Sequence, residues 1–143
     1  TLNKLPAHLL PYVPLFCTAV SKMTTKKNHF EQLDKLIESN TSDISVSPQT
    51  NTFVKQVKDQ SVLYYEEGIL MKTTALDYKT ANMFEIIEEI LTGTLFDDHQ
   101  RLQSLMLQLT NDVQEEIVYS ANRYASLVAK SNLSSHFKTK ETW

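Results

Sequence analysis

Only two segments of the chain have the pattern of β-strands, and a short polar stretch separates them. Residues 44–47 alternate apolar and polar side chains up to Pro48, and residues 62–74 are rich in β-branched and aromatic side chains around Gly68. We expect these segments to form an antiparallel pair, with Gly68 as a candidate for a bulge. Residues 49–60 are predicted to be either a loop or the far end of the first strand turning back. Because two strands alone make a marginal sheet, the missing strands should lie outside the ends of the chain.

The rest of the chain has the apolar periodicity of amphipathic helices. Two glycines in 143 residues is a low content, which favours helices over a turn-rich all-β fold. The predicted order is helix, helix, strand, strand, helix, helix, helix, so the fold class is α/β, with helices packed on a partly missing antiparallel sheet. The chain opens on Thr1 without a methionine. We therefore expect residues 1–143 to be a single partial domain of a larger protein, with a break near residue 122 between the C-terminal helices.

Two prolines in the stretch Leu10–Val20 fix the start of the first predicted helix. The first four N–H groups of a helix have no partner inside it, so proline is tolerated there. A helix that begins at Pro11 also holds Pro14 within its first turn. The apolar stripe of this helix is then Leu10, Val13, Phe16, Cys17 and Val20.

Capping residues predict the ends of the later helices. Asn28 and Glu31 have the spacing of a capping box for a second helix, which ends near Ser39-Asn40. Gly93 is placed to end the third helix, and Asp97 or Asp98 to cap the fourth. The expected buried stripes are Phe30, Leu33, Leu36 and Ile37 in the second helix, Met83, Phe84, Ile87, Ile90 and Leu91 in the third, and Leu102, Leu105, Met106, Leu109 and Val113 in the fourth.

Composition excludes several classes of protein. A hydrophobic fraction of 41% with 22% charged residues is typical of a globular chain. No apolar run approaches the roughly 20 residues of a membrane-spanning helix. The net charge of −3 gives no general attraction to nucleic acid, and one cysteine excludes an internal disulfide framework.

Potentially reactive residues are few, and we expect no catalytic or metal-ligating residue among them. Cys17 falls within an apolar stripe, where a thiol packs as a small hydrophobe, although an enzyme that uses Cys17 as nucleophile is an alternative. No pair of histidines has the spacing of zinc ligands on a helix. The four histidines are His8, His29, His99 and His136.

Charged clusters and glycosylation triplets also have structural explanations. Glu85, Glu88 and Glu89 are expected to form a solvated face opposite the apolar stripe of their helix. The aspartates of Asp97-Asp98-His99 suit a helix N-terminus better than a metal site. A basic turn and two triplets complete the candidates: Lys22, Lys26 and Lys27, then Asn40-Thr41-Ser42 and Asn132-Leu133-Ser134.

The stretch LPAHLLPYVPLFCTAV resembles a segment of the presequence protease branch of the pitrilysin-type zinc metallopeptidases, which has Leu-Pro and then LLPYxPLF at a helix start. Further matches follow in family order. They are Phe30–Leu33, Thr41–Pro48 against TGGISxSP, Met83–Leu91 against MFELLxEIL, and Arg123–Ala125 leading to Leu133-Ser134. The chain departs from the family at Ser42-Asp43, where two glycines are usual. This departure puts in doubt any substrate contact at that corner.

The resemblance implies a place within a clamshell of four related α/β domains that encloses a chamber. This segment is similar to the third domain, which carries no zinc ligands, whereas zinc and the H-x-x-E-H helix belong to the first. The resemblance thus implies a non-catalytic, chamber-forming segment of a zinc metalloendopeptidase that degrades short unfolded peptides, such as cleaved targeting presequences. Its partners would be the remainder of the same peptidase and peptide substrates, not nucleic acid or a membrane.

By the same resemblance, the location would be the mitochondrial matrix, with a plastid or another organelle as the alternative. No substrate-binding residue can be named from the matched motifs. The alternative from a different class is a stand-alone α/β interaction domain without catalytic activity.

Overall fold

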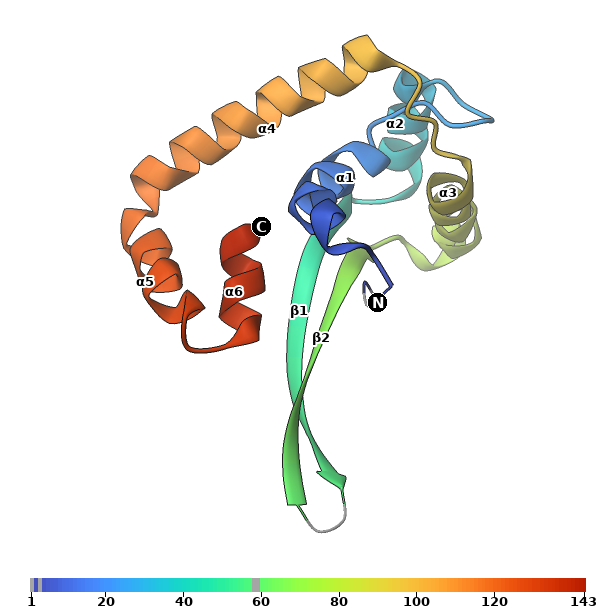
Figure 1. The fold of residues 1–143 in the computed structure, drawn as a ribbon. Helices are drawn as coiled ribbons and strands as arrows, with labels where there is room; N and C mark the ends of the chain where they lie inside the picture. The colour runs from blue at the N-terminus through green and yellow to red at the C-terminus, as the bar shows by residue number, and fades with distance from the viewer. Residues whose placement is uncertain (1, 3, 58–59) are drawn as a thin grey trace. The chain divides into compact units, whose positions relative to one another are not determined.

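The computed structural model describes residue 2 and residues 4–57 and 60–143. Its elements are a 3-10 helix Ala7–Tyr12, α1 Val13–Val20, α2 Phe30–Asn40, β1 Ile44–Val57, β2 Gln60–Thr73, a 3-10 helix Asp77–Lys79, α3 Thr80–Gly93, α4 His99–Tyr119, α5 Ala121–Ser131 and α6 Ser135–Thr142 (Figure 1). β1 and β2 form a two-stranded antiparallel sheet. The predicted α/β class is confirmed.

The chain divides into two compact units. The first holds Thr1–Pro14, Pro48–Leu70 and Asn111–Trp143, and the second holds Leu15–Ser47 and Met71–Thr110. Helices α1 and α4 and both strands cross the division, so each contributes to both units.

The second unit contains two clusters of buried apolar side chains. One joins α1, α2, β1 and α3 and comprises Val20, Leu33, Ile44, Ile86 and Ile90, while the other comprises Ala19, Met23 and Leu105. Leu33 and Met23 are completely buried. These clusters anchor the loop between α1 and α2.

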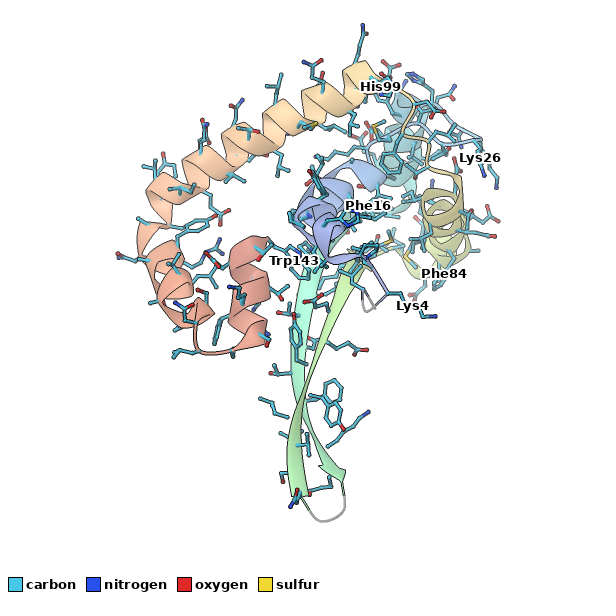
Figure 2. All side chains as sticks on the ribbon, viewed as in Figure 1. Lys4, Phe16, Lys26, Phe84, His99 and Trp143 are labelled. Atoms are coloured by element: carbon cyan, nitrogen blue, oxygen red, sulfur yellow. The ribbon has the colours of Figure 1, made fainter. Side chains whose placement is uncertain are left out.

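The first unit contains α5, α6 and the outer part of the strand pair. Thr139 Oγ1 of α6 donates to Glu67 Oε1 of β2 over 2.8 Å, and Trp143 Nε1 donates to the carbonyl oxygen of Leu10 over 3.0 Å. The side chain of Tyr65 contacts Glu67 and Thr139 through its hydroxyl. Side-chain hydrogen bonds therefore link α6 to the sheet and to the N-terminal segment (Trp143 is labelled in Figure 2).

The first helix begins two residues later than predicted. Pro11 lies in a 3-10 helix, and α1 starts at Val13, which makes Pro14 its second residue. At that position the missing N–H of proline costs no helical hydrogen bond. Phe16 is exposed, contrary to the predicted stripe, and its ring centroid lies 5.9 Å from that of Phe96.

The second helix starts with a different cap from the one predicted. Phe30 is the first residue of α2, and Gln32 Oε1 accepts a hydrogen bond from the backbone N–H of His29 over 3.3 Å. Asn28 does not cap α2, because its amide donates instead to Glu89 of α3. The predicted end of the helix near Asn40 is confirmed.

β1 runs through Pro48 to Val57, so residues 49–57 are the far end of the strand and not a loop. A strand with one unpaired edge can accommodate the missing N–H of proline. β2 is one strand through Gly68. No helix in the described part of the chain is both long and apolar enough to cross a membrane.

The C-terminal half matches the predicted order with one addition. α3 ends at Gly93, as predicted. Of the two candidate caps for α4, Asp98 accepts a hydrogen bond from the N–H of Arg101 over 2.9 Å. α6 was not predicted, although Ser134 caps it by accepting from the N–H of Phe137.

The buried face of α3 is rotated relative to the predicted stripe. Ile86, Glu89, Ile90 and Gly93 are its buried residues, whereas Phe84 and Leu91 are 61% and 65% exposed (Phe84 is labelled in Figure 2). Ile86 and Ile90 pack into the cluster formed with α1 and α2, which fixes this orientation of the helix.

Candidate functional site

Glu89 is the one member of the predicted acidic face that is buried, with 7% of its surface exposed. Its Oε1 accepts from the hydroxyl of Thr25 and, over 2.9 Å, from the side-chain amide of Asn28, whose Nδ2 also lies 3.1 Å from Oε2. The prediction that Glu89 is solvated is therefore wrong. Glu85 and Glu88 are exposed, as expected.

The carboxylate of Glu89 holds the loop that joins α1 to α2. Within this loop, Asn28 donates its backbone N–H to Thr25 Oγ1, and Thr25 donates its own N–H to the carbonyl oxygen of Asn28, both over 2.9 Å. Lys26 donates its N–H to the carbonyl oxygen of Gly93 over 2.9 Å. A buried carboxylate with three donor contacts thus acts as a structural anchor here.

Cys17 lies in α1 and is only 3% exposed. Burial raises the pKa of the Cys17 thiol to about 11. A thiol with so high a pKa remains protonated at neutral pH, whereas the thiolate is the nucleophilic form. The interpretation of Cys17 as a packing residue is consistent with this environment.

The histidines lie at separate places along the chain. His8, His29 and His99 are exposed, and His136 is half-buried in α6. Burial, together with the nearby charge of Lys140, lowers the pKa of His136. Across residues 2, 4–57 and 60–143, no three His, Cys, Asp or Glu side chains come together as metal ligands.

The remaining candidates have structural contacts or lie at the surface. Lys26 and Lys27 are exposed, and the carbonyl oxygen of Lys22 accepts from Arg101 Nε over 3.2 Å (Lys26 and His99 are labelled in Figure 2). Asn40 donates its side-chain amide to the carbonyl oxygen of Leu36 over 2.9 Å. Asn132 lies exposed after the end of α5.

Ser42 and Asp43, which replace the expected glycines, form the corner between α2 and β1. The N–H of Ser42 donates to the carbonyl oxygen of Thr74 over 2.9 Å, and the two hydroxyls are also hydrogen-bonded. A cavity of about 410 Å³ lies beside this corner and is lined in part by Glu38, Thr41 and Lys79. The corner is held by hydrogen bonds between the segments before β1 and after β2.

Comparison with known proteins assigns the family. A family described as peptidase-associated, from the peptidase branch that includes the presequence proteases, matches residues 1–143. The chain belongs to this family. Membership confirms the resemblance to the presequence protease branch.

Relatives of the chain are named mitochondrial presequence proteases. That of Danio rerio is 32% identical over 132 residues, which cover 92% of this chain and 12% of the relative. That of Gibberella zeae is 31% identical over 146 residues, covering 100% of this chain and 14% of the relative. The corresponding figures for Mus musculus are 28% over 144 residues, 100% and 13%. The chain therefore spans only a small part of the length of these relatives.

Proposed function

We propose that this chain is a non-catalytic, chamber-forming segment of a zinc metalloendopeptidase that degrades short unfolded peptides, such as cleaved targeting presequences. The observation that carries the proposal is the match of the whole chain to a peptidase-associated family, together with relatives named presequence proteases. The mitochondrial matrix is the proposed location, because those relatives are named mitochondrial.

Zinc would be held by residues outside this chain. The described residues do not fit a zinc site, since they contain no group of three candidate ligands. When bound elsewhere in the enzyme, zinc would activate the water that attacks the peptide bond. The part played by this chain would be to support the wall that limits access to unfolded peptides.

The rest of the same peptidase is the proposed partner of this segment. The chain matches 12% of the length of its Danio rerio relative, and apolar side chains such as Phe84, Leu91 and Tyr119 are well exposed. Exposed apolar surface of this kind is suited to contact with other domains.

The test is peptide cleavage by the full natural protein that contains this chain. A presequence-type peptide, amphipathic and rich in Arg, should be cleaved, whereas a folded protein carrying the same sequence in an ordered helix should resist. Cleavage should stop when zinc is removed by a chelator and return when zinc is restored. Equal cleavage of the folded and unfolded substrates would contradict a size-selective chamber, and absence of any peptidase activity would contradict the proposal as a whole.

A further inference from the structure

A cationic groove lies between α5 and α6, within the first unit. It is a cavity of about 440 Å³, lined by Arg123, Ser126, Leu127, Lys130, Phe137 and Lys140. Three of these six residues are basic, and none is acidic. The lining therefore combines an apolar floor of Leu127 and Phe137 with a positively charged rim.

The positive charge of this groove contrasts with the rest of the chain. Residues 121–143 contain four Lys or Arg side chains and one Glu, although the whole chain has a net charge of −3. A local concentration of one charge sign attracts ligands of the opposite sign. The groove is thus suited to an anionic partner.

Two of the three cations on the rim have no carboxylate partner in the described part of the chain. Arg123 forms an ion pair with Glu116, which precedes α5. Lys130 instead lies over the ring of Phe137, with Nζ 5.7 Å from the ring centroid. Lys130 and Lys140 are exposed and free of carboxylates in residues 4–57 and 60–143, so both can pair with an incoming acid.

The spacing and the floor of the groove favour a peptide over a single phosphate group. Arg123 and Lys130 are seven residues apart on α5, which corresponds to about 10 Å along a helix. One phosphate cannot contact both cations at that separation, whereas carboxylates spread along a peptide can. The apolar floor would receive a side chain such as Leu, and the concave shape does not match a flat lipid surface.

We propose that the groove between α5 and α6 binds an acidic peptide segment in which Asp or Glu side chains flank an apolar residue. The carboxylates would pair with Lys130 and Lys140 while the apolar side chain packs on Leu127 and Phe137. Targeting presequences are rich in Arg and poor in acidic residues, so they are not the ligand of this groove. The proposal does not depend on the peptidase function.

Binding of a short fluorescein-labelled peptide rich in Glu and Leu, followed by fluorescence anisotropy on the full chain, tests the proposal. Lys130→Gln with Lys140→Gln should weaken binding by about 2- to 25-fold, because an exposed ion pair contributes about 0.2–1 kcal/mol. The matched control, Lys26→Gln with Lys35→Gln, removes the same charge from exposed positions outside the groove and should leave binding unchanged. Binding should also weaken as salt is raised.

A second variant tests the groove without changing charge. Ser126→Phe places a large side chain within the lining and should abolish binding while circular dichroism remains that of the parent chain. Equal binding of a peptide in which every Glu is replaced by Lys would overturn the proposal. So would equal effects of the groove and control lysine pairs, or binding of anionic phospholipid vesicles, and not of the acidic peptide, that depends on Lys130 and Lys140.

Discussion

Replacement of Glu89 by leucine should destabilise the chain, even though leucine is apolar and the site is buried. The carboxylate accepts from Thr25 and Asn28. Without it, the Thr25 hydroxyl can still donate to the carbonyl oxygen of Asn28, 3.1 Å away, but the Asn28 amide loses its acceptor. An unsatisfied buried donor costs about 1–3 kcal/mol, and a hydrogen bond to a charged group contributes about 1.5–3 kcal/mol. We expect a net loss of about 2–4 kcal/mol.

Urea unfolding, followed by circular dichroism, measures this loss. With an m-value of about 2 kcal/mol/M, the midpoint should fall by about 1–2 M. The control is Glu88→Leu on the same helix, where the side chain is exposed and the change should stay within about 0.5 kcal/mol. Glu89→Gln, which keeps one acceptor oxygen, should lose less than Glu89→Leu.

A double-mutant cycle isolates the contact itself. Glu89→Gln combined with Asn28→Ala should show a coupling free energy of at least about 0.5 kcal/mol, whereas Glu88→Gln combined with Asn28→Ala should show none. If Glu89→Leu is neutral or stabilising, or if the two cycles agree, the anchoring role of Glu89 is refuted.

Three further predictions concern single residues. The thiol of Cys17 should resist a thiol reagent at pH 8 in the folded chain and react after unfolding in urea, because burial raises its pKa to about 11; rapid labelling of the folded chain would contradict this. The pKa of His136 is lowered by burial and by Lys140, so the unfolded chain binds the proton more tightly. The stability that neutral His136 contributes is therefore present above about pH 6.5 and lost as the pH falls through the folded pKa. His136→Asn should flatten that part of a plot of urea midpoint against pH, and an unchanged plot would exclude His136 as its origin. Asp98→Ala should cost about 1 kcal/mol in urea unfolding through loss of the α4 cap, whereas Asp97→Ala should cost only a few tenths; equal losses would count against Asp98 as the cap.

The elements that local sequence determines were predicted well. Gly93 ends α3, Asp98 caps α4, and the two β-rich segments pair as expected. Each of these features depends on residues within one or two turns of each other or on neighbouring segments. Where the signal is local, the sequence alone is sufficient.

Features that depend on distant residues were missed. The burial of Glu89 follows from a loop 61 and 64 residues away in the sequence, whose Asn28 and Thr25 supply the donors. The same contact removes Asn28 from its predicted role as a helix cap. Periodicity also could not choose between two apolar faces of α3, because Phe84 and Leu91 are as hydrophobic as the buried Ile86 and Ile90. Packing against α1 and α2 decides which face is covered.

The helix α6 was missed for a different reason. Residues 135–142 are polar and lack an apolar stripe, so their periodicity gives no helical signal. Ser134 at the N-cap was the one available indication, and it coincides with a glycosylation triplet. Packing against α5 and hydrogen bonds to β2 stabilise this helix in place of a strong local pattern.

Our central proposal is that this chain is part of a zinc peptidase but supplies neither its nucleophile nor its metal ligands. The most direct test replaces Cys17 by Ala and His8, His29, His99 and His136 by Gln together in the full natural protein. Zinc content by elemental analysis and the rate of cleavage of a presequence-type peptide are then compared with those of the parent protein. We predict that both remain unchanged in the folded variant. Loss of zinc, or loss of cleavage with the fold intact, would contradict the proposal.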